Sequence, residues 1–320
     1  MGNIISQSFP PKSLFTVEQI PDLTGQVMIV TGGNTGIGKE TCKALLIKNA
    51  KVYLAARSKS RADAAIEWLK SETDGKAPVF LELDLANLAS VRKAVEEFKS
   101  KEQELHVLFN NAGVMGTPVE QRTADGYDLQ FGTNVLGHYF FTTLLLPTLI
   151  HTAKFSSLAC GHTRVINTSS SAVYHAPKGG IIWETLGIGA PSLRACKTLG
   201  PNQLYYQSKL GNVLFSNEVA KRYAEQGIIS SSLNPGAIFK QNSCATCHGC
   251  LLNSSVLLSI LRAMELSLNC GPAPCPRVRT TTARQFLIPW ARAGDAGPYS
   301  HDEKLAERLW AWLEEQVKEH

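Results

Sequence analysis

The chain has 320 residues, of which 44% are apolar and only 18% are charged, so it can bury a substantial core in one large or two ordinary domains. Its formal net charge of +5 is not concentrated in any basic run with interleaved aromatic residues, which leaves nucleic-acid binding without support. The longest strongly apolar stretch, 140–150, is interrupted by Pro147 and too short to span a bilayer, so we expect a buried helix there.

Residues 1–20 are expected to form a leader outside the folded domain. The opening MGNIIS lacks the basic and apolar regions of a secretory signal, but it matches the acylation pattern M-G-x-x-x-[ST] with Gly2 and Ser6. So short a pattern often arises by chance, and one acyl chain gives only marginal anchoring. We expect a cytoplasmic protein with reduced cysteines, with peripheral membrane contact through an acylated Gly2 as the alternative.

From residue 25 to residue 233, short β-branched runs alternate with amphipathic stretches. The apolar runs predict strands over 26–31, 51–56, 79–83, 106–110, 164–169 and 228–233. Helical spacing predicts helices over 37–49, 60–72, 88–100, 127–145 and 205–225. This alternation indicates an α/β fold, a single doubly wound Rossmann-type domain over 21–320 with a parallel sheet and helices on both faces. Its ligand is expected at the carboxyl ends of the strands.

The first predicted strand leads directly into TGGNTGIG, in which Gly32, Gly36 and Gly38 open a helix. Glycines let the backbone approach a pyrophosphate, and the helix N-terminus supplies free N–H donors and a positive dipole end. A plain Gly-rich turn is the alternative, but the position between a strand and a helix of a βαβ unit favours a dinucleotide.

The end of the second predicted strand bears on the choice of cofactor. A site for NAD usually places an acid about 20 residues after the glycines, where it binds the ribose 2′-OH. This chain has Arg57 there, and Lys39 follows the last glycine. Two cations without a carboxylate suit a 2′-phosphate, so we expect NADP(H). A solvated surface arginine is the alternative interpretation of Arg57.

Further motifs follow the glycine loop in chain order. The full series is TGGNTGIG, DL (84–85), NNAG (110–113), Asn134 in FGTNVLGH, INTSS (166–170), YYQSK (205–209) and NPG (234–236). With these motifs the chain resembles the short-chain dehydrogenase/reductase family, most closely its retinol-dehydrogenase-like and fungal reductase members. The resemblance covers about residues 20–240 and returns near 286–292.

The resemblance implies a role for each of four catalytic residues. Ser170 would hydrogen-bond the substrate carbonyl, and Tyr205 would donate the proton in reduction or accept it in oxidation. A free phenol with a pKa near 10 is a poor acid at neutral pH, so it needs a nearby cation. Lys209, at i+4 from Tyr205, would favour the phenolate and bind the nicotinamide ribose. Asn134 would hold a water that extends a proton relay from Lys209.

Alternatives remain for these assignments. Tyr205 alone is also compatible with a core aromatic residue on an amphipathic helix. The catalytic serine is identified within one position, because Ser169 and Ser171 flank Ser170. Tyr206 lacks the spacing to Lys209.

The residues expected to bind the cofactor follow from the glycine loop and the resemblance together. Asp84 would contact the adenine and Asn111 the ribose region, although Asp84 could equally be a helix N-cap. The full predicted set is Gly32, Asn34, Gly36, Ile37, Gly38, Arg57, Asp84, Asn111, Tyr205, Lys209 and Ile238.

The implied function is an NADP(H)-dependent oxidoreductase that interconverts a carbonyl and an alcohol on a small to medium apolar substrate by hydride transfer. A catalytically impaired NADP-binding protein with an altered lid is the alternative. Residues 170–204 are an insertion in which Trp183 and Leu186 either line a substrate pocket or pack in the core. Homo-oligomers through the helix that carries Tyr205 are common in the family, but members of this branch can be monomers.

Residues 237–283 depart from the family pattern and are treated as an atypical substrate-lid segment before a C-terminal strand and helix (284–320). Lys240 stands where a threonine is expected, and 251–268 has the pattern of a lid helix or a membrane-touching surface. A motif C-x-x-C-H within NSCATCHGC allows haem attachment or a zinc site. Haem attachment needs export, and the cysteine framework is loose for zinc, so we expect no metal and favour reading-frame or splice variation. The cysteines and histidine concerned are Cys244, Cys247, His248, Cys250, Cys270 and Cys275.

Overall fold

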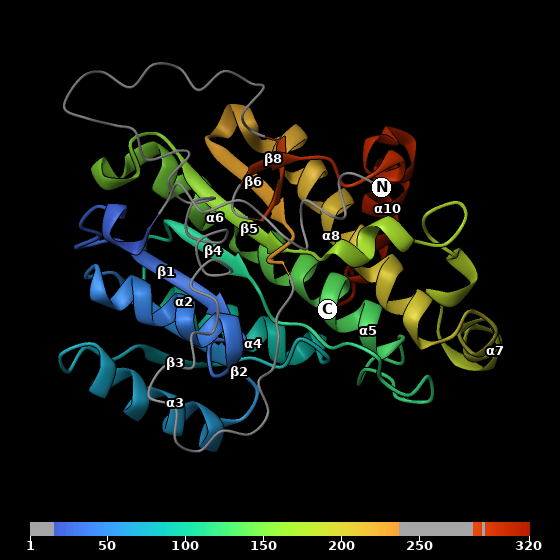
Figure 1. Cartoon of the computed structure of the whole chain (residues 1–320), viewed down its shortest axis with the longest axis horizontal. Helices are drawn as coiled ribbons and strands as arrows, with labels where there is room; N and C mark the ends of the chain where they lie inside the picture. Colours follow the sequence, from blue (N-terminus) through green and yellow to red (C-terminus); the bar gives the residue numbers. More distant parts are fainter. Residues whose placement is uncertain (1–15, 237–283, 290–291) are drawn as a thin grey trace.

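A mostly parallel sheet forms the centre of the molecule, and its strand order determines where a ligand can bind. The computed structural model describes residues 16–236, 284–289 and 292–320, and these contain eight strands in the order β3-β2-β1-β4-β5-β6-β7-β8 (Figure 1). All neighbours pair in parallel except β8, which runs antiparallel to β7. The strands are β1 (Val27–Thr31), β2 (Lys51–Ala56), β3 (Val79–Glu82), β4 (Val107–Asn110), β5 (Thr163–Thr168), β6 (Ile228–Leu233), β7 (Arg284–Ile288) and β8 (Arg292–Gly294). The order reverses between β1 and β4, so a ligand crevice is expected beyond their carboxyl ends.

Helices cover both faces of the sheet. The helices α2 (Gly36–Ile47) and α3 (Lys59–Glu72) pack on one face with the chain around Leu23. The other face carries α4 (Leu88–Lys101), α6 (His138–Phe155) and α8 (Pro201–Tyr223), and the red C-terminal helix α10 (Glu303–Gln316) lies beside α8 (Figure 1). The shorter helices are η1 (Val17–Gln19), α5 (Leu129–Phe131), η2 (Gly132–Gly137), η3 (Ser157–Ala159), η4 (Ser171–His175), η5 (Trp183–Thr185), α7 (Gly189–Leu199), η6 (Ala224–Gln226) and η8 (Pro298–His301).

Local sequence explains where the elements begin and why the strands are interior. Every residue of β1 is buried, as expected for a parallel strand with helices on both sides. Asn87 caps α4 by accepting a hydrogen bond from the Ser90 amide, and Asp302 caps α10 by accepting one from the Leu305 amide. The caps satisfy amide donors that the first turn of each helix leaves free.

The doubly wound α/β fold predicted from the sequence is confirmed, and the predicted strands agree with the observed ones to within about a residue at each end. The helix expected over 127–145 is instead α5, then a π-helix, η2, and then α6. A further helix, α7, forms within the insertion, where no helix was predicted.

Several expectations fall outside the residues that the structure describes. These are the lid segment 237–283, Gly2, Ile238, Lys240 and the cysteine cluster around Cys244. Within the described ranges Cys42, Cys160 and Cys196 are free thiols, and no group of three or more potential metal ligands occurs there.

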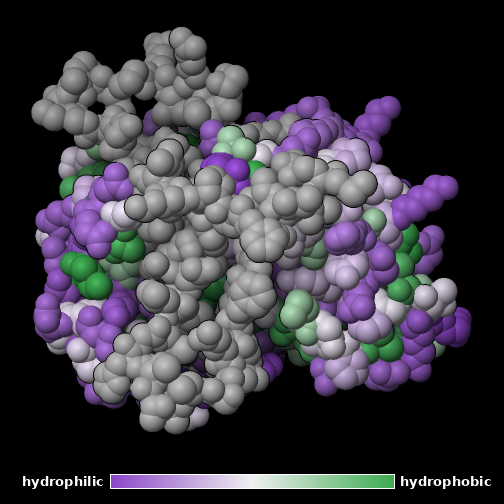
Figure 2. Space-filling view, viewed as in Figure 1, coloured by the Kyte–Doolittle hydropathy of each residue, from purple (hydrophilic) through white to green (hydrophobic). Residues whose placement is uncertain are grey.

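None of the helices in the described ranges is both long and apolar enough to cross a bilayer. Hydrophilic residues predominate on the coloured parts of the face in Figure 2, and the apolar ones there are scattered. Isolated apolar side chains of this kind are normal for a protein surface.

Candidate active site

The glycine loop after β1 has the close backbone packing that a bound pyrophosphate requires. A Cβ on Gly38 would lie 2.3 Å from the Gly32 carbonyl oxygen, so no larger residue fits there. Gly36 has φ +53°, and a Cβ on it would meet nothing within 4 Å, so the loop is open on that side. Gly36 is also the first residue of α2, where backbone N–H groups are free for an anion. The residues present therefore fit the pyrophosphate of a dinucleotide.

The carboxyl ends of β2 and β3 form the side of the site expected to hold adenosine. The Arg57 side chain is 66% exposed, and its Nη1 lies 4.0 Å from Asp84 Oδ2. Both residues line a depression of about 410 Å³, together with Lys93. Lys39 is not among the lining residues, since its Nζ lies 3.6 Å from the ring centroid of Trp68 on α3. Of the two cations predicted for a 2′-phosphate, only Arg57 faces this depression.

Asp84 is not the helix N-cap that the sequence left open as an alternative. That position belongs to Asn87, and α4 begins one residue later. Asp84 Oδ1 accepts a hydrogen bond from the Ala86 amide at 3.0 Å, and the other carboxylate oxygen faces Arg57. The carboxylate is therefore fixed at the edge of the depression.

The side chains of Ser170, Tyr205 and Lys209 come together at the carboxyl end of β5. Tyr205 and Lys209 lie one turn apart on α8, and Lys209 Nζ is 5.6 Å from the Tyr205 ring centroid. Ser170 is two residues beyond β5, and its side chain hydrogen-bonds that of Tyr205. The neighbouring Ser169 is buried, and its hydroxyl donates to the Lys209 carbonyl at 2.8 Å. Ser170 is therefore the serine available to a substrate next to Tyr205.

Burial shifts the proton affinities of the two central groups in opposite directions. It raises the pKa of Tyr205 above its ordinary value, and the hydrogen bond with Ser170 only partly opposes this. The ammonium of Lys209 is buried and donates to the Thr168 carbonyl at 3.1 Å. Burial lowers the pKa of Lys209 to about 8. The arrangement keeps the phenol protonated at neutral pH and leaves beside it an amine that releases a proton only slightly above neutrality.

Asn134 lies in the π-helix η2, and its side chain forms a clamp, that is, it hydrogen-bonds both the loop after β4 and helix α8. Its Oδ1 accepts from the Val114 amide at 2.8 Å, and its Nδ2 donates to the Val114 carbonyl and to Ser208 Oγ, both at 3.0 Å. The loop after β4 is thereby held against α8. A Cβ on Gly113 would lie 3.4 Å from Lys209 Nζ, which shows how closely this loop passes the amine. Both side-chain donors of Asn134 are therefore engaged within the protein.

Sequence reasoning missed two buried residues that support this clamp. His138, one turn after Asn134, places Nδ1 3.0 Å from the Asn134 carbonyl oxygen and Nε2 2.9 Å from Thr31 Oγ1. The Thr31 hydroxyl in turn accepts hydrogen bonds from the amides of Asn111 and Ala112 at 2.9 and 3.0 Å. Both residues stand in motifs that the sequence singled out, TGGNTGIG and FGTNVLGH. The i+4 spacing of His138 from Asn134 was the available signal.

The insertion packs Trp183 against the C-terminal helix and Leu186 into the core. Leu186 is buried in the core, whereas the Trp183 ring is half-buried beneath the Arg308 guanidinium, 4.0 Å from its centroid. Leu186 is therefore a packing residue. Tyr206 pairs with His175, with ring centroids 5.6 Å apart.

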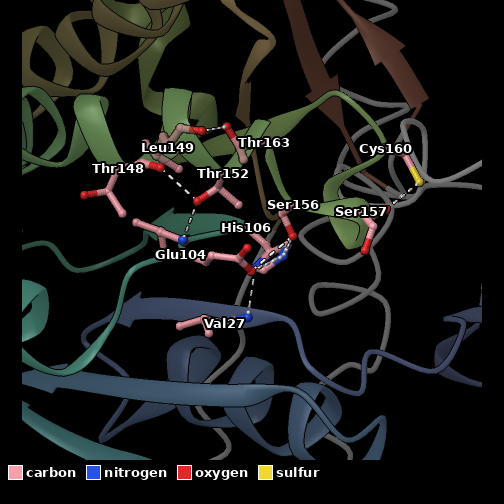
Figure 3. A network of polar contacts seen from close by, with 11 residues as sticks. Val27, Glu104, His106, Thr148, Leu149, Thr152, Ser156, Ser157, Cys160 and Thr163 are labelled. Atoms are coloured by element: carbon pink, nitrogen blue, oxygen red, sulfur yellow. Dashed lines mark hydrogen bonds and ion pairs between the residues drawn. The ribbon is translucent and has the colours of Figure 1, made fainter. Parts of the chain in front are cut away.

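A second buried polar network lies at the amino ends of β1 and β4, opposite the first (Figure 3). His106 Nε2 is 3.1 Å from Ser156 Oγ, which donates to Glu104 Oε2 at 3.1 Å. Serine, histidine and acid are the components of a hydrolytic triad, but here the Val27 amide donates to Nδ1 of His106 at 3.0 Å. Nε2 of the neutral ring then carries the hydrogen and cannot take a proton from the serine. The network is therefore structural.

The chain is similar to known proteins in sequence and in structure. The sequence profile described as short chain dehydrogenase matches residues 26–183. A short-chain dehydrogenase/reductase of Armillaria gallica is 49% identical over 325 residues, covering 100% of both chains. Retinol dehydrogenase 12 of Homo sapiens is 34% identical over 291 residues, covering 90% of this chain and 85% of that protein. The solved structure of an uncharacterised protein from Mycobacterium paratuberculosis has a TM-score of 0.67 at 26% identity, covering 95% of this chain and 97% of that one.

A Rossmann-type sheet with a glycine loop at its switch point defines a nucleotide-binding oxidoreductase fold. The chain belongs to the short-chain dehydrogenase/reductase family, and its relatives include both a retinol dehydrogenase and fungal members. The resemblance inferred from the motifs is confirmed.

Proposed function

We propose that this chain is an NADP(H)-dependent oxidoreductase that interconverts a carbonyl and an alcohol on a small to medium apolar substrate. One observation carries the proposal: Tyr205, Ser170 and Lys209 converge at the carboxyl end of β5, in a sheet whose switch point carries the glycine loop. Ser170, Tyr205, Lys209 and Asn134 are the proposed catalytic residues.

Each of these residues has a distinct task in this proposal. When bound, the dinucleotide supplies or accepts the hydride. Ser170 hydrogen-bonds the substrate oxygen and orients it towards the Tyr205 hydroxyl, which delivers the proton in reduction. The raised pKa of Tyr205 keeps the phenol in the protonated form that reduction consumes. Lys209, whose pKa is lowered to about 8, restores the proton, with Asn134 at the next step outward.

NADP(H) is proposed over NAD(H) because of Arg57. Its guanidinium lines the depression at the end of β2 and meets Asp84 only at 4.0 Å, so it can engage a 2′-phosphate with paired donors. Of the cofactor-binding set inferred from the sequence, Arg57 and Asp84 line this depression, and Gly32, Gly36 and Gly38 belong to the segment that runs from the end of β1 into the first turn of α2.

The catalytic assignment is tested with Tyr205→Phe, which removes the proton donor and leaves the ring. With purified full-length protein and a panel of carbonyl compounds, kcat should fall by at least about a hundredfold while the Kd for NADPH is nearly unchanged. Tyr206→Phe is the matched control and should retain turnover. Unchanged turnover in Tyr205→Phe would remove this residue from the mechanism. Tight NADPH binding without turnover of any carbonyl by the wild type would instead favour the impaired nucleotide-binding protein.

Cofactor preference is tested with Arg57→Asp. Loss of the charge-assisted hydrogen bonds to a 2′-phosphate should shift the ratio of the NADPH and NADH dissociation constants towards NADH by about tenfold to a hundredfold. Quenching of cofactor fluorescence measures both constants. Arg194→Asp makes the same charge change on α7, at an exposed position, and should leave the ratio alone. An unchanged ratio in Arg57→Asp contradicts the 2′-phosphate argument.

A further inference from the structure

His138 is a buried residue that joins two parts of the site. It is 2% exposed and lies at the start of α6, next to the π-helix that carries Asn134. One ring nitrogen reaches the Asn134 main-chain carbonyl at 3.0 Å, and the other reaches the Thr31 hydroxyl at the end of β1 at 2.9 Å.

The partners of the ring fix its protonation pattern. A carbonyl oxygen can only accept, so Nδ1 of His138 carries the hydrogen that it donates to Asn134. In the neutral ring Nε2 is then an acceptor, and the Thr31 hydroxyl donates to it rather than to the Phe109 carbonyl, which is farther away at 3.2 Å. Burial and the nearby charge of Lys209 both favour the neutral ring.

The two hydrogen bonds act on different functions of the site. The Asn134 carbonyl belongs to the residue proposed to pass a proton outward from Lys209, whereas Thr31 binds the loop that places Asn111 beside the nucleotide. Once its proton is committed to His138, the Thr31 oxygen is oriented to accept from the amides of Asn111 and Ala112. A single ring thus sets the geometry on both sides.

We propose that His138 is a positioning residue which holds the Asn134 carbonyl and the Thr31 hydroxyl as one unit, coupling the proton-relay side of the site to the nucleotide side. This inference rests on the proposed function. Nδ1 serves the relay and Nε2 serves the nucleotide loop, so the two contributions are separable by substitution.

Two amide substitutions separate them. The asparagine amide is one carbon closer to the backbone than the glutamine amide. In His138→Asn it therefore lies near the position of Nδ1, so it can still donate to Asn134 but does not reach Thr31. In His138→Gln the amide lies near the position of Nε2, so it can accept from Thr31 but does not reach Asn134. His138→Phe fills the ring volume and makes neither bond.

The measurements are kcat with NADPH and an active carbonyl, the Kd for NADPH, and the thermal midpoint Tm. His138→Asn should retain kcat to within about threefold and bind NADPH more weakly, whereas His138→Gln should bind NADPH normally and lose kcat about tenfold or more. His138→Phe should lose both. Asparagine is the smallest of the three replacements and leaves a cavity, so His138→Asn should have the lowest Tm. The variant with the highest expected kcat would therefore be the least stable one. A purely structural role predicts that kcat follows Tm.

His106→Phe is the matched control, since it replaces another buried histidine at the opposite end of the sheet. It should lower Tm while kcat and the Kd for NADPH stay at the wild-type values. Equal losses of kcat in His106→Phe and His138→Gln overturn the inference, as does a kcat in His138→Gln that equals that of the wild type.

A readout independent of turnover separates this inference from the proposed function. Ring ¹⁵N NMR of the full-length protein, assigned by the signals lost in His138→Asn and His106→Phe, should show the hydrogen on Nδ1 of His138 and on Nε2 of His106. A hydrogen on Nε2 of His138 overturns the inference even if the enzyme is active. If the wild type turns over no carbonyl, the proposed function fails, while the tautomer of His138 and the Kd for NADPH of the His138 variants still test the link between His138 and the nucleotide loop.

Discussion

Two buried histidines lie at opposite ends of the sheet, one in a structural hydrogen-bond network and the other next to the proposed active site. His106, at the amino ends of the strands, accepts from the Val27 amide through Nδ1, whereas His138, at the carboxyl ends, donates to the Asn134 carbonyl through Nδ1. The two neutral rings therefore carry their hydrogen on opposite nitrogens. Burial lowers the pKa of both.

The surroundings of the two rings differ in whether they leave hydrogen-bond donors available to a ligand. Near His106, Thr152 Oγ1 accepts from the Leu105 amide and donates to the Thr148 carbonyl (Figure 3). Near His138 lies Lys209, a buried amine whose ammonium donates only to Thr168 among the hydrogen bonds of the described residues. Its other donors are free for a ligand. Both ends hold a buried cation, Arg164 near His106 and Lys209 near His138, but only Lys209 lies beside the proposed proton donor, Tyr205.

Lys209→Met is the substitution with the largest expected effect on this contrast. Turnover should fall below detection, but the nucleotide-free protein should become more stable at pH 7. Burial depresses the pKa of Lys209 from 10.5 to about 8, which corresponds to about 3 kcal/mol against the charged form. The wild type should regain this stability only as pH rises from about 8 to 10.5, because the unfolded chain then binds more protons than the folded one.

Chemical denaturation of both proteins at pH 7 and pH 10 measures the difference. The stability advantage of Lys209→Met should be largest at pH 7 and smaller at pH 10. A methionine variant that is less stable than the wild type at pH 7 would mean that the buried amine stabilises the fold, and the contrast between the two ends would not hold.

The parts of the site that could be predicted from the sequence are those whose interacting residues are close together along the chain. The glycine loop and the i+4 spacing of Tyr205 and Lys209 are local, and in the structure the loop leads into α2 while the two side chains belong to neighbouring turns of α8. The choice of Ser170 over Ser169 was not local, because it rests on a hydrogen bond from Ser169 to the carbonyl of Lys209, 40 residues away. Likewise, Lys39 lies over Trp68 only because α2 packs on α3.

The missed elements have similar physical causes. The helix pattern over 127–145 has continuous apolar spacing, so nothing in its periodicity indicates the π-helical turn at Asn134. His138 reads as an ordinary core residue until its partner Thr31, 107 residues earlier, is placed against it. His106 and Ser156 are 50 residues apart and meet only when β4 and the end of α6 are in place.

The acid range offers a smaller and finer test of the two histidines. Burial lowers the pKa of His138 from 6.5 to about 4 and also lowers that of His106. The unfolded chain therefore binds more protons below pH 6.5, so both groups contribute stability above that pH, and this stability is lost as pH falls through their folded pKa values. For His138 the loss approaches about 3 kcal/mol near pH 4.

The measurement is the change in the free energy of unfolding between pH 7 and pH 4.5 in wild type, His138→Gln and His106→Gln. Each variant lacks one titrating ring, so each should lose less stability on acidification than the wild type does. The reduction should be larger for His138, since Glu104 favours the charged form of His106 and partly offsets its burial. A larger reduction in His106→Gln would mean that folding lowers the pKa of His106 more than that of His138, which is the opposite of the expected ranking.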